Sequence, residues 1–465
     1  MFNSKLIAGG LTALLLGSAP VALAQSGAPI SLQDAVTVAV NSNPEVAQAQ
    51  FNTEAIQFER KQAQGLFAPR IDIEASAGMR HLDNATRRSL NINDQELYPL
   101  EAQARGEWIV LDFGRRKGEL LRQAARVDGA SLRVVERSEF IALQVARQYL
   151  DVLLQQRVVA ASQDNVSFHQ TLVGDLDTGV QQGSISIADQ QQAQERLQAA
   201  LVRQTEAELA LEEAQITLRR LTGLDISQVQ MPQTLAEQLP ASLDEAVGLA
   251  RTSNPRVREA DADVDASHAL ADSAKGDLFP RIGVDVVGRY GDDIDGFRGT
   301  TKDVQGRVFL RWNIFDGGIN LAKHQEMVRR ASEARYRLYQ VTREAEEDVR
   351  TAWATQRAQA RVINDLSTQS KVSDDLLLSY RSQFNVGRRS LLDVLDAQNT
   401  RYSVQVRLET ARFSDMFARY QVLASVNRFL TGLNVVPGAG SGMNERSRFN
   451  YGPPAPAELQ YRSRP

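Results

Sequence analysis

Two aspartates three residues apart, Asp393 and Asp396, are the side chains of this chain best placed for a chemical task. They follow a turn at Gly387, and the apolar residues around them keep a helical spacing. Positions three apart share one helix face, so both carboxylates can point in the same direction. Such a pair concentrates negative charge, and the chemistry that this charge supports is cation binding.

Helix capping explains part of the same pattern without any function. Ser390 and Asp393 form an S-x-x-D signal for the start of a helix, and Ser186 and Asp189 form another. Acidic residues in a first turn are favoured by the helix dipole, typically by ~0.3–1 kcal/mol. Asp393 and Asp189 can therefore be caps, whereas Asp396 lies past the first turn, where capping explains less.

No set of residues in the sequence suggests catalysis. The chain has no cysteine, which excludes disulfides, thiolate catalysis and cysteine-ligated metals. Its four histidines are scattered without the spacing of metal ligands, and we expect each of them on the surface: His81, His169, His268 and His324. Phosphate-binding, dinucleotide-binding and hydrolase motifs are missing from the sequence. The sequence therefore predicts a protein that is not an enzyme and needs no cofactor or metal.

Residues 1–24 have the pattern of a secretory signal peptide. Lys5 precedes an apolar run that ends at Leu16, and small residues lead to a cleavage site after Ala24. The run is too short for a membrane-spanning helix. Removing this segment leaves 52 of the 53 basic residues against 57 acidic ones, a balance that gives no sign of a nucleic-acid surface.

The rest of the chain is duplicated. The stretch SLQDAVTVAVNSNP at 31–44 returns as SLDEAVGLARTSNP at 242–255, an offset of 211 residues. Further on, Trp108-x-x-x-Asp112-x-Gly114 returns as Trp312-x-x-x-Asp316-x-Gly318, an offset of 204. These echoes predict two copies of one layout, and the expected boundaries are a first repeat at 25–223, an equatorial linker at 224–241, a second repeat at 242–433 and a disordered tail at 434–465.

Within each repeat, the spacing of the apolar residues changes between a helical period and a period of two. Alternation of apolar and polar residues predicts two strands in each repeat, near 69–80 and 101–112 and near 280–290 and 303–315. About ten residues suffice to cross a bilayer when a strand is tilted. Trp108 and Trp312 lie at matching strand ends, where aromatic residues prefer a membrane interface. An ordinary soluble sheet is the alternative.

Helical periods fill the remainder of each repeat. We expect an opening helix such as 31–66, a long helix of about 100 Å at 115–181 and 319–385, and a return helix at 187–221 and 390–430. A return helix stacked on an opening helix would equal one long helix in length. The long helices have apolar positions on two sides, which predicts a neighbour on each side.

The duplicated motifs, in this order over residues 31–433, resemble the TolC family of outer-membrane efflux and secretion channels. The resemblance implies a mainly α fold with a membrane β-barrel portion. Three protomers, each with four strands, would close a twelve-stranded β-barrel on a barrel of twelve helices. Closure by other subunits agrees with the physics, because unpaired strand edges find no water in lipid.

The segment from Phe384 to Gln398 is similar to the tapered periplasmic tip of that family. The similarity implies that Asp393 and Asp396 form an acidic ring that gates the channel. It also implies a gate lock between Arg389 and Asp189. A tyrosine that supports this lock in some members is Phe384 here, so its hydroxyl hydrogen bond is lost.

The function expected from this resemblance is a passive exit duct in the outer membrane of a Gram-negative bacterium. Its implied partners are two further copies of the chain, outer-membrane lipid, a periplasmic adaptor and an inner-membrane ABC or proton-driven transporter. The sequence RSLLDVLDAQ at 389–398 favours type I protein secretion, with multidrug or small-molecule efflux as the alternative. A periplasmic adaptor or a soluble coiled-coil scaffold is a remote alternative, and no motif identifies the cargo.

Overall fold

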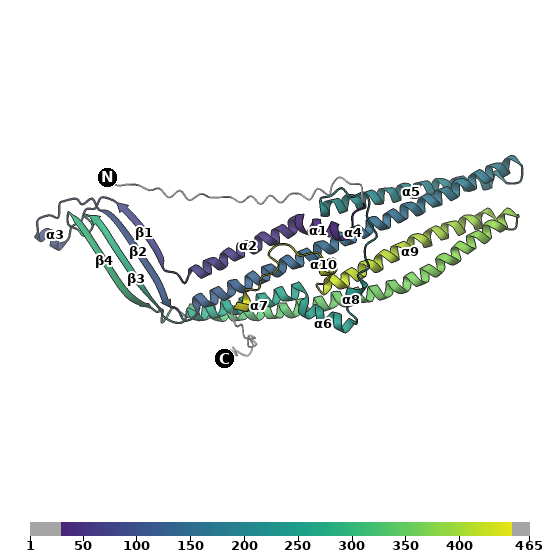
Figure 1. Cartoon of the computed structure of the whole chain (residues 1–465). Coiled ribbons are helices and arrows are strands. Elements are labelled where there is room, and N and C mark those ends of the chain that lie inside the picture. Colours follow the sequence, from purple (N-terminus) through teal and green to yellow (C-terminus); the bar gives the residue numbers. More distant parts are fainter. Residues whose placement is uncertain (1–28, 449–465) are drawn as a thin grey trace, which may run out of the picture.

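A computed structural model describes residues 29–448, so the expected signal peptide and the end of the tail lie outside the described residues (Figure 1). The molecule is elongated, with a sheet at one end and two helical hairpins at the other. The four strands and the long helices that the sequence predicts are all present. Within residues 29–448, none of the helices is long and apolar enough to cross a membrane.

The element order repeats, as the duplication requires. The first half contains α1 (Leu32–Ser42), α2 (Pro44–Gly65), β1 (Arg70–Ala77), α3 (Ala85–Ser89), β2 (Leu100–Leu111), α4 (Arg115–Gln181) and α5 (Ile187–Thr222). The second half contains α6 (Leu243–Ser253), α7 (Pro255–Gly276), β3 (Arg281–Asp292), β4 (Thr300–Arg311), α8 (Ile319–Asn385), α9 (Leu391–Ser425) and the short α10 (Phe429–Gly432).

The opening helix of each half is divided in two, where we expected one continuous helix. Asn43 separates α1 from α2, and its side-chain oxygen accepts from the amide of Glu45 at 2.9 Å. Pro44 stands at the first helical position, where its missing N–H costs nothing. Asn254 and Pro255 repeat this arrangement. The residue before a proline avoids the helical region, so the chain bends at both places.

The four strands form one antiparallel sheet in the order β1-β2-β3-β4. Ala102 of β2 lies opposite Ala75 of β1 and Tyr290 of β3, so apolar residues gather on one face. Glu74, Gln103 and Arg289 form a matching polar row on the other face. The alternation read from the sequence is therefore the alternation of the sheet, and β1 and β4 are its two edges.

The helices pack side by side in one curved layer. Beside the sheet the neighbours are α2, α4, α7 and α8, and towards the far end they are α5, α4, α9 and α8. The Asn254 side chain donates to the carbonyl of Ser425 at 2.9 Å, which joins the start of α7 to the end of α9. Two shorter helices placed end to end thus run along one long helix, as the expected helix lengths predicted.

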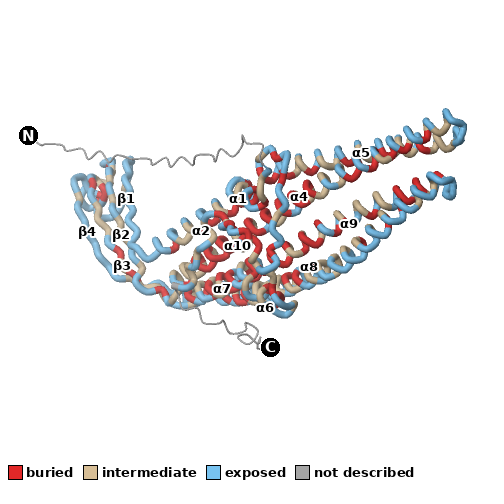
Figure 2. The backbone as a smooth tube through the Cα atoms, turned by 45° about the vertical axis from the view of Figure 1, so that its right-hand side comes forward, coloured by how far each residue is buried: buried red, intermediate tan, exposed pale blue. Residues whose placement is uncertain are grey.

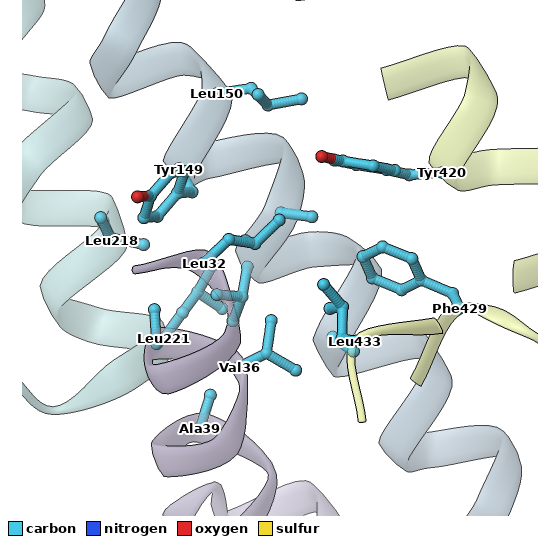
Figure 3. Packing of buried hydrophobic residues seen from close by; sticks show 14 of the residues in the cluster. Leu32, Val36, Ala39, Tyr149, Leu150, Leu218, Leu221, Tyr420, Phe429 and Leu433 are labelled. Carbon is cyan, nitrogen blue, oxygen red and sulfur yellow. The ribbon is translucent and has the colours of Figure 1, made fainter. Parts of the chain in front are cut away.

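The main core lies where the shorter helices meet, halfway along the molecule (Figure 2). Leu32 and Val36 of α1 pack there beside Tyr149 of α4 and Leu218 of α5 (Figure 3). The Tyr149 hydroxyl lies 2.6 Å from the carbonyl oxygen of Gln230, in the linker between the repeats. Burial is concentrated here, whereas the sheet and the far hairpin ends are mostly exposed (Figure 2).

The prediction of a disordered tail is wrong for residues 434–448. The amide of Gly438 donates to Ser138, and the Arg446 guanidinium contacts Asp128 of α4 at 3.1 Å and Asp265 of α7 at 2.7 Å. Glu445 pairs with Arg60 of α2 at 2.9 Å. A composition rich in Gly, Ser and Arg misled because the partners of this segment are distant helices, not neighbours in sequence.

Replacing Arg446 with Ala should lower the free energy of unfolding by about 2–4 kcal/mol, because nearly buried Asp128 loses its cation. Thermal unfolding of the purified protein measures the change. Arg258→Ala, at an exposed position of α7, is the matched control and should have little effect. Equal destabilisation by both variants would contradict a clamp at Arg446.

Glu139 of α4 is an acid buried in the middle of the molecule, 6% exposed. Burial raises its pKa to about 8, although the amide of Leu430 donates to it at 3.3 Å and opposes the rise. The folded chain therefore holds a proton that the unfolded chain releases above pH 4.5. Stability from this group is complete below that pH and is lost as the pH rises towards 8.

Glu139→Gln should remove this part of the pH dependence, because an amide has no proton to lose. The unfolding temperature of the variant should fall less between pH 5 and pH 8 than that of the wild type. Glu54→Gln, at an exposed position of α2, serves as the control and should keep the wild-type slope. An unchanged slope in Glu139→Gln would show that this carboxyl is ionised throughout.

Candidate functional site

The candidate site is the far tip, where each hairpin turns (Figure 1). The turns lie at 182–186 and 386–390, between α4 and α5 and between α8 and α9. Gly183 and Gly387 have φ angles of 73° and 71°, a left-handed conformation that favours glycine. The two turns are therefore built alike, and each presents a Ser-x-x-Asp start to its return helix.

Asp393 and Asp189 take part in helix capping, in which Ser390 and Ser186 are the N-cap residues. The Ser390 hydroxyl accepts from the Asp393 amide at 3.2 Å and donates to the Asp393 carboxylate at 2.8 Å. Ser186 and Asp189 form the same pair of contacts. Hydrogen bonds from Ser390, and then the charge of Arg389, hold the pKa of Asp393 below its usual value.

Arg389 does not contact Asp189 within the described part of one chain. Its guanidinium stacks on the ring of Tyr380 at 4.4 Å, donates to Gln383 at 3.1 Å and lies 3.7 Å from Asp393. These partners were not predicted. Tyr380 lies one turn before Phe384 on α8, and Gln383 directly precedes Phe384. Local spacing does not show that Arg389, which lies beyond the turn, folds back onto them.

Phe384 and Asp396 have opposite surroundings. Phe384 packs against an apolar cluster that includes Leu172 and Leu176 of α4 and Leu391 of α9, so it lies where the two hairpins meet. Asp396 is exposed, while its neighbours Leu395 and Ala397 are buried. Within residues 29–448 it has no hydrogen bond or ion pair, so its carboxylate is available to a cation or to another copy of the chain.

A buried polar cluster near the tip was missed by sequence reasoning. Gln398 of α9 donates to Asn165 of α4 at 2.8 Å, and His169 lies one turn further along α4. His169 is 5% exposed and His324 is 6% exposed, so the expectation of surface histidines is wrong for both. Burial, with Arg196 and Arg203 nearby, lowers the pKa of His169 to about 4. No local pattern links positions 165 and 398.

Trp108 and Trp312 mark the junction between the sheet and the helices. The Trp108 indole donates to the carbonyl of Phe67 at 3.0 Å, and the Trp312 indole donates to that of Leu278 at 3.2 Å. Both rings are about half exposed. An amphipathic ring with one bonded end and one apolar surface suits a boundary between lipid and water.

The polar face of the sheet is filled with ion pairs. Asp285 of β3 accepts from Arg307 of β4 at 2.5 and 2.7 Å and from Arg105 of β2 at 3.3 Å. Arg311 donates to Glu107 at 2.9 Å. A charged face opposite an apolar face is the arrangement of a barrel with a wet interior and a lipid-facing exterior.

A family model described as "Outer membrane efflux protein" matches residues 35–224 and 246–426, which is most of the chain and both repeats. The chain is 23% identical over 380 residues to the outer membrane protein TolC of Vibrio cholerae, covering 77% of this chain and 82% of that one. It is 24% identical over 291 residues to the outer membrane efflux protein BepC of Brucella suis, covering 61% of this chain and 62% of BepC, less than two thirds of its length.

Solved structures show the same fold. The CmeC outer membrane channel of Campylobacter jejuni superposes with a TM-score of 0.76 at 13% identity, covering 90% of this chain and 88% of that chain. The helical layer, the four strands and their order along the chain therefore follow an established channel architecture. The family resemblance stated from the sequence is confirmed.

Capping and gating predict different results for the two tip aspartates. Asp393→Ala should speed amide hydrogen exchange in residues 388–394, because the Ser390 amide and hydroxyl lose the carboxylate that accepts from them at 3.3 and 2.8 Å. The helix start also loses a favourable first-turn charge of ~0.3–1 kcal/mol. Asp396→Ala, the matched control one turn later, should leave this exchange unchanged. Hydrogen exchange read by mass spectrometry measures both. Faster exchange in Asp396→Ala would mean that Asp396 also stabilises the turn.

Proposed function

The chain belongs to the outer membrane efflux protein family, and on this premise we propose that it is the exit duct of a tripartite export system for type I protein secretion. It is an outer-membrane channel protein and not an enzyme. In the proposal, three copies form the duct, and a periplasmic adaptor joins it to an inner-membrane ABC or proton-driven transporter. The transporter supplies the energy.

The observation that carries the proposal is the sheet with two open edges. β1 and β4 each expose a row of backbone groups, and the apolar face includes Ile73 at 81% and Val308 at 74% exposure. Lipid can cover such a face but cannot satisfy the unpaired edges. Further copies of the chain satisfy them, and threefold symmetry gives twelve strands.

Type I secretion is favoured by the tip segment 389–398, whose sequence looks somewhat more like that branch than like the efflux branch. Small-molecule efflux is the second candidate, because BepC is named an efflux protein. Deleting the gene separates the two. Loss of a secreted protein from the medium with unchanged drug tolerance supports secretion, and increased drug sensitivity with unchanged secreted proteins supports efflux. Wild-type protein supplied in trans should restore the lost phenotype.

At the tip, Asp396 is proposed to line the acidic constriction, joined by Asp393 where its cap leaves an oxygen exposed. Asp396→Ala should weaken block of the channel by multivalent cations several-fold in planar bilayers, because the ring loses three charges. Asp225→Ala removes an exposed carboxylate from the linker between the repeats and should leave block unchanged. Undiminished block in Asp396→Ala would remove this residue from the ring.

The proposed lock between Arg389 and Asp189 then acts between neighbouring copies, since one copy does not form it. Exposed ion pairs contribute only about 0–1 kcal/mol each, which suits a closure that has to open. Arg389→Ala should raise single-channel conductance. Arg388→Ala, at the adjacent exposed position, is the control. Equal conductance in both variants would contradict the lock.

A further inference from the structure

We propose that β4 of one copy pairs with β1 of the next in one particular register, in which Val308, Leu310 and Trp312 lie opposite Ala77, Ala75 and Ile73 of the next copy. This inference rests on the proposed assembly of several copies. It goes further by fixing which residues of β4 and β1 lie opposite each other at the interface between two copies, called the seam below. The register follows from the internal duplication of the chain.

The two hairpins of the sheet pair their strands in equivalent registers, although their connecting loops differ in length. In the first, Ile71 pairs with Gly106 and Ala75 pairs with Ala102. In the second, Ile282 pairs with Leu310 and Val286 pairs with Gly306. Every β1 residue is shifted by 211 to reach β3, and each β2 residue that pairs with β1, from Leu100 to Glu107, is shifted by 204 to reach β4. These are the two offsets found in the sequence.

Contacts beyond the strands repeat with the same offsets. The indoles of Trp108 and Trp312 donate to the carbonyls of Phe67 and Leu278, which are 211 residues apart. Asp112 accepts from the amide of residue 116 at 3.1 Å, and Asp316 accepts from that of residue 320 at 3.0 Å. The duplication therefore holds from the end of the opening helix to the start of the long helix.

The junction between the repeats shows how two such hairpins join. In it, Trp108 of β2 pairs with Val284 of β3, Gly106 with Val286, and Ala104 with Gly288. β4 is the second copy of β2, and β1 is the first copy of β3. A cylinder of alike hairpins repeats this junction wherever two hairpins meet. At the interface between copies, each β2 residue is replaced by its β4 counterpart and each β3 residue by its β1 counterpart. The three pairs then become Trp312 with Ile73, Leu310 with Ala75, and Val308 with Ala77.

Side-chain chemistry agrees with this register. A slip of one residue would turn apolar side chains to the polar face, so only even shifts are possible. In the proposed register, Arg311 of one copy lies opposite Glu74 of the next on the polar face. Among the residues that the structure describes, the Glu74 carboxylate takes part in no ion pair or hydrogen bond, so it can accept this partner.

The lengths of β2 and β4 also support pairing between β4 of one copy and β1 of the next. β2 continues to Leu111, which pairs with Ile282, whereas β4 ends at Arg311. The counterpart of Leu111 is Phe315, which is 86% exposed and lies beyond the strand. The counterpart of Ile282 is Ile71, 72% exposed on the edge of β1. We therefore expect residues 312–315 to extend β4 when β1 of a second copy pairs with it.

Cysteine pairs test the register, because the chain has no cysteine of its own. Ala75→Cys with Leu310→Cys should give covalent dimers and trimers on denaturing gels after treatment of outer membranes with a thiol cross-linker of about 5 Å, the separation of opposite Cβ atoms. The matched variants Ala75→Cys with Val308→Cys and Ala77→Cys with Leu310→Cys place the thiols two residues out of register. They should give several-fold less product.

The outcomes separate the register from the assembly. Stronger cross-linking in either matched variant overturns the register and leaves the assembly of copies standing. Equal, low cross-linking in all three pairs overturns the β1–β4 seam and with it the proposed function. Single-cysteine variants set the background, and the amount of each variant in the outer membrane shows that it folds and inserts.

Discussion

A sheet in lipid must satisfy every backbone N–H and C=O from within the protein, and this constraint organises the molecule. Four strands pair with each other in one protomer and leave β1 and β4 open. Leaving a row of such groups unpaired in hydrocarbon costs several kcal/mol for each group. The sheet is therefore part of a larger object, and the helices below must be arranged to continue the same cylinder.

Because of the duplication, the same arrangement of strands and helices occurs twice in each protomer, and both copies can continue the same cylinder. Each repeat supplies a hairpin of strands, one long helix and three shorter helices that together match its length, namely α1, α2 and α5 in the first repeat and α6, α7 and α9 in the second. Asn43 and Asn254 end α1 and α6 at matching places, and these short helices pack into separate apolar clusters, α1 around Tyr149 and α6 around Val349. Helices of equal total length can then stand side by side without a step at either end.

Patterns that recur within a few residues were readable from the sequence, and contacts over long separations were not. Alternation between Ile71 and Ala77 predicted a strand, and a Ser-x-x-Asp signal predicted the start of α9. The break at Asn43 was also local and was overlooked, although an Asn-Pro step carries the signal. The pairing of Gln398 with Asn165 depends on how two hairpins pack. At the tip, the caps were predictable, whereas the stacking of Arg389 on Tyr380 was not.

The contacts of residues 434–448 impose an order on folding. Glu445 pairs with Arg60 of α2, and Arg446 pairs with Asp128 of α4 and Asp265 of α7, so an early helix of the first repeat gains these partners only after the second repeat has been synthesised. A chain that lacks residues 434–448 leaves Asp128 of α4 and Asp265 of α7 without the guanidinium of Arg446. These contacts tie the first repeat to the second, so the folding of α2 and α4 is completed only when both repeats are present.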